Sequence, residues 1–74
     1  MPITMASVGD VVTIKKITGK DDVRQRLAEL GFVVDAVVTV VSKVAGNLIL
    51  QVQSGRVALD SSMANRIIID REGD

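Results

Sequence analysis

The residues whose types and spacing first suggest chemistry in this chain are two adjacent aspartates, Asp21 and Asp22. Paired carboxylates can contribute oxygen ligands to a hard cation such as Mg²⁺ or Ca²⁺. The same two residues are also typical of the first turn of a helix, where negative charge complements the helix dipole. We prefer the helical interpretation, and we expect neither a metal site nor a bound cofactor.

Other catalytic groups are scarce. The chain contains no histidine, cysteine or tyrosine, so most general bases and strong nucleophiles are missing. The imidazole and thiolate ligands that most transition-metal sites use are missing for the same reason. Four lysines remain, and all are expected on solvated strand faces or turns: Lys15, Lys16, Lys20 and Lys43. We therefore expect that the protein is not an enzyme.

The charge balance argues against nucleic acid and membrane partners. Nine basic and nine acidic residues cancel, whereas nucleic-acid binders and membrane-surface anchors usually carry a basic face. Phe32 is the only aromatic residue, so bases would lack a stacking platform. No apolar run approaches the length of a membrane-spanning helix, and the first ten residues do not resemble a signal peptide. We expect a soluble, cytoplasmic protein.

The 74 residues predict a single domain over 1–74, with a frayed polar tail at 71–74. Of these residues, 47% are hydrophobic, and a domain this small has a thin core. We therefore expect some aliphatic side chains on the surface, where contiguous apolar patches often mark contacts with partners.

One α-helix is predicted over about 22–30. Asp22 as N-cap and Gln25 three residues later match a capping box. Val23, Leu27 and Leu30 form one apolar stripe. Gly31 stands where a residue with positive φ often ends a helix, and Phe32 follows it as an apolar contact.

Alternating apolar and polar residues predict five short strands, and the connections are too short for parallel crossovers. A single helical turn is expected at about 61–65, capped by Asp60 and the serines after it. These elements favour a mainly β fold, a small SH3-like antiparallel barrel, with an OB-like barrel as the second choice. The strands are expected at 11–17, 36–44, 48–53, 56–59 and 67–69.

The order of these parts resembles the FeoA family and the SH3-like C-terminal domains of iron-dependent repressors. The most specific element is the run from Arg26 to Phe32, RLAELGF, which is similar to the family signature R-L-x-x-L-G-hydrophobic. Two positions depart from the family pattern: Val34-Asp35 replaces a Pro-Gly turn, and Asp60 replaces an arginine. The residues that carry the resemblance are Gly9, Gly19, Leu27, Leu30, Gly31, Phe32, Gly55, Ala58, Leu59, Ala64 and Ile67.

The resemblance implies an accessory role in ferrous iron uptake, through contact with the cytosolic part of the FeoB membrane permease. The alternative is a metal- or peptide-sensing module of the repressor type. For the first role we expect contact through the helix and the valine-rich segment after it, because the valines there cannot all point into one small core. The oligomeric state stays open. The candidate contact residues are Arg24, Arg26, Glu29, Val33, Val37 and Val41.

Overall fold

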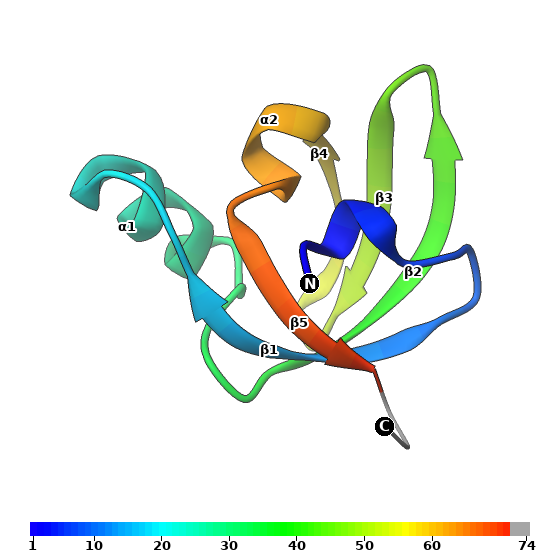
Figure 1. Ribbon diagram of the computed structural model, residues 1–74, viewed down its shortest axis with the longest axis horizontal. Helices are drawn as coiled ribbons and strands as arrows, with labels where there is room; N and C mark the ends of the chain where they lie inside the picture. The colour runs from blue at the N-terminus through cyan, green and yellow to red at the C-terminus, as the bar shows by residue number, and fades with distance from the viewer. Residues whose placement is uncertain (72–74) are drawn as a thin grey trace.

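Five antiparallel strands, two α-helices and one 3₁₀ turn make up residues 1–71, the part of the chain that the computed structural model describes. The mainly β prediction is therefore confirmed. Of the predicted frayed tail 71–74, Arg71 belongs instead to the last strand, where it pairs with Val12, and residues 72–74 lie outside the described residues (Figure 1). In chain order the elements are η1 (Ile3–Met5), β1 (Val11–Ile17), α1 (Asp21–Glu29), β2 (Val37–Val44), β3 (Asn47–Val52), β4 (Gly55–Asp60), α2 (Ser61–Ala64) and β5 (Ile67–Arg71).

The period of two in the sequence determines which side chains of each strand face the core. In β3, Leu48, Leu50 and Val52 are buried, and the residues between them are only half-buried. Val12 and Ile14 of β1 are buried in the same way. Successive side chains of a strand point to opposite faces, so one face of each strand closes the core and the other meets solvent.

The strands form one sheet in the order β4-β3-β2-β1-β5. Within residues 1–71 no ladder joins β4 to β5, so closure of the sheet into a barrel is not confirmed. β4 and β5 are instead connected by the short helix α2, whose Ala64 is fully buried. The helix lies at the top of the view in Figure 1, between the end of β4 and the start of β5.

The N-terminal segment packs against the sheet. It contains the turn η1, and both Ile3 and Ala6 are fully buried. Pro2 forms an isolated bridge with Ile68, and the Ile69 N–H donates to the Met1 carbonyl at 2.7 Å. The first residues thus cover the outer edge of β5 and complete the core.

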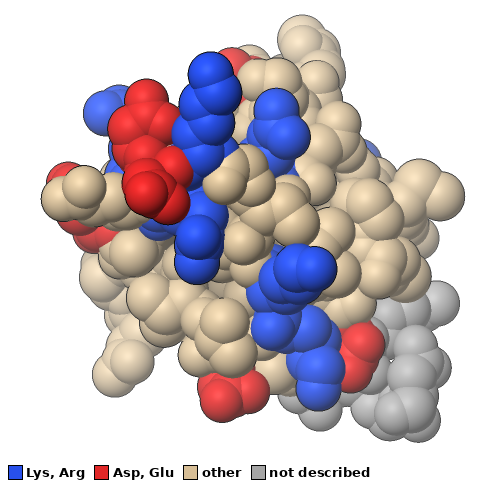
Figure 2. Space-filling view, turned by 60° about the vertical axis from the view of Figure 1, so that its left-hand side comes forward, with Lys and Arg blue, Asp and Glu red and all other residues tan. Residues whose placement is uncertain are grey.

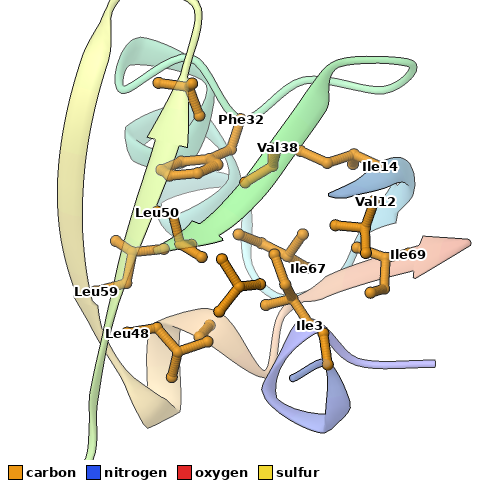
Figure 3. Packing of buried hydrophobic residues seen from close by; sticks show 14 of the residues in the cluster. Ile3, Val12, Ile14, Phe32, Val38, Leu48, Leu50, Leu59, Ile67 and Ile69 are labelled. Atoms are coloured by element: carbon orange, nitrogen blue, oxygen red, sulfur yellow. The ribbon is translucent and has the colours of Figure 1, made fainter. Parts of the chain in front are cut away.

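The core consists of aliphatic side chains around a single aromatic ring. Phe32 is the largest fully buried side chain, and side chains from every strand converge on the same cluster (Figure 3). Its members are Ile3, Ala6, Val12, Ile14, Leu27, Phe32, Val38, Val40, Leu48, Leu50, Val52, Leu59, Ala64, Ile67 and Ile69.

The start of α1 differs from the predicted capping box. The N-cap is Lys20, which makes no side-chain capping bond, and Asp22 lies inside the first turn. One carboxylate oxygen of Asp22 accepts from the N–H of Val23, its own neighbour. The other aspartate, Asp21, forms an ion pair with Arg24 at 3.7 Å. Both aspartates still complement the helix dipole, so the helical interpretation of this pair is correct although the cap is not.

The end of α1 follows the prediction. Gly31 has φ +101°, its N–H donates to the Ala28 carbonyl at 3.0 Å, and the N–H of Phe32 donates to the Leu27 carbonyl at 2.9 Å. This pair of bonds is a Schellman motif. It turns the chain so that Phe32 enters the core directly after the helix, which anchors α1 at one end of the sheet (Figure 1).

The turn between α1 and β2 keeps a backbone conformation that favours glycine, although the residue is an aspartate. Asp35 has φ +73°, a region that aspartate tolerates better than most residues. Its N–H donates to the Ile14 carbonyl at 2.8 Å, and the Ile14 N–H donates to the Ala36 carbonyl at 2.9 Å. Val34-Asp35 therefore still forms a turn, although it replaces Pro-Gly, and the two hydrogen bonds to Ile14 hold this turn to β1.

Asp60 caps α2, as the sequence predicts. One carboxylate oxygen accepts from the N–H of Met63 at 2.8 Å and from the hydroxyl of Ser62 at 3.1 Å. We expect Asp60→Ala to lower the free energy of unfolding by about 0.5–2 kcal/mol, because the first turn of α2 loses its acceptor. Asp22→Ala is the control, since Asp22 does not cap α1. Urea unfolding of the two variants measures the difference, and equal losses would contradict the capping role.

Candidate protein-binding surface

An exposed group of valines follows α1 and continues into β2. Val33, Val34 and Val37 have exposed fractions of 47%, 55% and 53%. Their neighbours Phe32 and Val38 are fully buried, so the same backbone that inserts those side chains into the core directs these valines to solvent. We call Val33, Val34 and Val37 the valine patch.

A groove lies beside the valine patch, where the turn after α1 approaches the turn between β3 and β4. The Cβ position of Gly31 would lie 3.4 Å from a methyl carbon of Val52 and 3.5 Å from the Ser54 hydroxyl, so the two turns are in close contact. Apolar walls with a few polar groups are typical of surfaces that bind partners. The groove is lined by Gly31, Val33, Asp35, Ala36, Val37, Gln53 and Ser54.

The apolar surface continues onto the neighbouring strand. Val11 pairs with Thr39 and Thr13 pairs with Val37, so Val11 and Val37 are diagonal neighbours on the outward face of β1 and β2. The exposed fraction of Val11 is 41%. Val11 therefore extends the exposed aliphatic surface from Val37 of the valine patch onto β1.

The charged residues expected at the contact surface lie apart from the groove. Arg24, Arg26 and Glu29 are all exposed on α1, and none of them lines the groove. Arg24 is in an ion pair with Asp21, while no ion pair of Arg26 or Glu29 occurs among the described residues. Figure 2 brings the side that carries α1 forward and shows acidic and basic side chains intermixed there. Such a face has no dominant sign of charge.

Val41 also lies apart from the valine patch. It stands where the register between β2 and β3 shifts, between Val40 and Ser42, and its side chain is half-buried. Of the six candidate contact residues, the structure therefore brings only Val33 and Val37 together at the groove.

Two groove residues, Gln53 and Ser54, were not expected from the sequence as part of a binding surface. They form the turn between β3 and β4, and the sequence shows them only as turn residues. Their approach to Gly31 depends on long-range packing. No local pattern in the sequence could have indicated it.

The residues that carry the family resemblance occupy structural positions. Gly9, Gly19 and Gly31 have positive φ and stand at turns, and Gly55 opens β4. Leu30 is half-buried against the core and Ala58 is exposed. The others are buried: Leu27, Phe32, Leu59, Ala64 and Ile67.

Two features that residues 1–71 lack bear on the kind of site. No group of three or more carboxylates lies together as a set of metal ligands in this part of the chain. None of the helices described is long and apolar enough to span a membrane.

Comparisons with known proteins agree with this architecture. The sequence model of the protein family described as the FeoA domain matches residues 1–71. The crystal structure of an iron uptake regulatory protein, FeoA, superposes with a TM-score of 0.88 at 25% sequence identity, covering 96% of this chain and 95% of that one. FeoA from Stenotrophomonas maltophilia, crystallised with zinc and described as an SH3 domain protein, gives a TM-score of 0.82 at 29% identity, with coverage of 95% and 89%.

A manganese-dependent transcriptional repressor in complex with manganese is also similar. It gives a TM-score of 0.87 at 24% identity, and the match covers 96% of this chain but 36% of the repressor, so it supports the fold alone. The comparison with curated proteins finds no match. The structural neighbours thus share one SH3-like fold, and they include both proteins of iron uptake and metal-dependent repressors.

Proposed function

The chain belongs to the FeoA family, and on this basis we propose that it is a cytoplasmic accessory protein of ferrous iron uptake that binds the cytosolic part of a FeoB-type permease. The role is one of contact and not of catalysis. It would regulate or help to assemble the permease.

Membership of the FeoA family supports a role in ferrous iron transport, and two of the structural neighbours are FeoA proteins described in connection with iron uptake. For the S. maltophilia FeoA, a role as a ferrous iron transport activating factor is suggested. The mode of action we propose for this chain, binding to the permease, is one way in which a protein can activate transport.

The valine patch is the observation that carries the proposal. Three valines within a stretch of five residues are each about half exposed, and two of them, Val33 and Val37, line the groove. Covering this surface is favourable by about 25 cal/mol per Å² of apolar area. Ser54 and Gln53 supply hydrogen-bonding groups at the other wall. A partner segment with an apolar anchor and adjacent polar groups fits this arrangement.

The test is isothermal titration calorimetry of the whole chain with the soluble cytosolic part of the permease. The double variant Val33→Asp/Val37→Asp should weaken binding by about tenfold or more, because it places two carboxylates where apolar contact is expected. Both residues are exposed, so the fold should be retained. Circular dichroism of the variant checks this.

Val44→Asp is the matched control. Val44 is exposed by 58% and lies at the far end of β2, roughly 23 Å from Val37 at the usual rise per residue. It should leave the affinity unchanged. Equal binding by the wild type and the double variant would exclude the valine patch as the contact, and no heat of binding with the wild type would exclude the partner.

The alternative, a sensing module of the repressor type, rests on likeness of fold alone, because the repressor is 24% identical and is matched over 36% of its length. SH3-like folds carry many unrelated functions. Family membership therefore favours the transport role.

A further inference from the structure

The two edges of the sheet are treated differently. The outer edge of β5 is covered by the N-terminal residues, through the Pro2–Ile68 bridge and the bond from Ile69 to Met1. β4, the strand at the other edge, pairs only with β3 among the described residues. An unpaired strand edge presents a row of free backbone groups that can pair with another strand.

The register identifies which backbone groups of β4 are free. The strand pairs with β3 without a bulge, from Val52↔Gly55 to Asn47↔Asp60, across a two-residue turn. In such a hairpin the closing pair is hydrogen-bonded, and the direction of the backbone groups alternates along the strand. The backbone N–H and C=O groups of Arg56 and Ala58 therefore point to the open edge, as does the backbone N–H of Asp60.

The side chains along this edge of β4 are complementary to the same edge of a second copy of the chain. Arg56, Ala58 and Asp60 are exposed and lie on one face of β4, two residues apart. If two copies of this strand pair antiparallel with Ala58 opposite Ala58, each Arg56 lies opposite Asp60 of the other copy. Ala58, the smallest of the three side chains, then lies at the two-fold axis, where the side chains of the two copies meet.

We propose that this chain self-associates through β4, in a two-fold antiparallel pair centred on Ala58 that joins the two sheets into one. The two Ala58 residues exchange both backbone hydrogen bonds, and opposite charges face each other on both sides of the axis. Cross-strand pairs of opposite charge stabilise such an arrangement, whereas like charges oppose it. The proposal does not rest on the proposed function.

The charged groups that this pairing needs are available. Arg56 uses its Nε–H to donate to the Gln51 side chain at 3.0 Å, and no ion pair occupies its guanidinium within residues 1–71. Asp60 uses a single carboxylate oxygen, Oδ1, for capping α2. The cap holds the Asp60 side chain in place at the strand end. Its second oxygen is left to accept from the opposite arginine.

A contact built on a six-residue strand buries little surface, so we expect a weak dimer that forms at high protein concentration. The first measurement is sedimentation equilibrium of the whole chain up to about 1 mM, the range in which weak complexes form. The expected result is a reversible monomer–dimer equilibrium. Amide resonances of Arg56, Ala58 and Asp60 should shift with concentration more than those of the valine patch.

Charge reversal then tests the register. Arg56→Glu makes the edge acidic and Asp60→Lys makes it basic, so each variant alone should dimerise more weakly than the wild type, by about tenfold or more. An equimolar mixture should recover the association, because the new carboxylate of one variant then faces the new ammonium group of the other, and the second charge pair is the native one. Arg24→Glu, on α1, is the control that changes charge away from the edge and should dimerise as the wild type does.

Asp60→Lys also loses the cap of α2, so circular dichroism must show that it is folded. If it is not, Ala58→Pro replaces it, because proline removes an N–H that points to the open edge and should abolish the dimer. A wild-type chain that stays monomeric at about 1 mM would overturn the proposal. A dimer that is indifferent to Arg56→Glu would overturn it as well.

Discussion

Leu27→Ala is expected to lower the free energy of unfolding by about 2–5 kcal/mol, the range for removing a fully buried leucine. Leu27 is the one fully buried side chain of α1, and it packs in the core cluster with Phe32. The helix has nine residues, too few to be stable in water by itself. The loss would be a large part of the stability of a small domain. Urea denaturation monitored by circular dichroism measures it.

Leu30→Ala is the matched control at the C-cap of the same helix. Leu30 is only half-buried against the core, so less contact is lost and less apolar area is exposed. We expect its effect to be clearly smaller than that of Leu27→Ala. Equal effects at both positions would show that the helix packs on the sheet in a different orientation.

Gly31→Val is expected to be destabilising for two separate reasons. The φ of Gly31 is +101°, and a β-branched residue held there is strained by about 1–3 kcal/mol. A Cβ atom would also lie 3.4 Å from the Val52 methyl, so the further methyl groups of valine would press the two turns apart. The midpoint of urea unfolding should fall, and the Schellman motif after Leu27 should be lost.

Gly9→Val separates the two reasons. Gly9 has φ +94°, close to that of Gly31, but nothing lies within 4 Å of its Cβ position. It should show the backbone strain without the steric cost. A stability loss at Gly9 as large as that at Gly31 would mean that the contact between the two turns contributes nothing.

Much of the secondary structure could be predicted from local pattern. The alternation in β1 and β3 indicates which side chains are buried, because a strand has a period of two. RLAELGF indicates the end of α1, because glycine accommodates positive φ without strain. The cap of α2 by Asp60 was equally local.

The start of α1 shows where local reasoning ended. Asp22 and Gln25 match a capping box, yet the helix begins at Asp21 and leaves Lys20 as N-cap. The local match therefore indicates that a helix begins near these residues, but it does not determine which residue is the N-cap.

Neighbours along the chain were sufficient to predict the antiparallel strands, the exit of α1 through Gly31 and the excess of aliphatic side chains. They were not sufficient to predict that, within residues 1–71, β4 and β5 do not pair with each other. Nor did they predict that Met1 and Pro2 cover the edge of β5, or that Ser54 lies close to Gly31 at the groove. These are contacts between distant segments. They depend on how a core of limited volume is filled from all sides at once, and no window of the sequence contains that information.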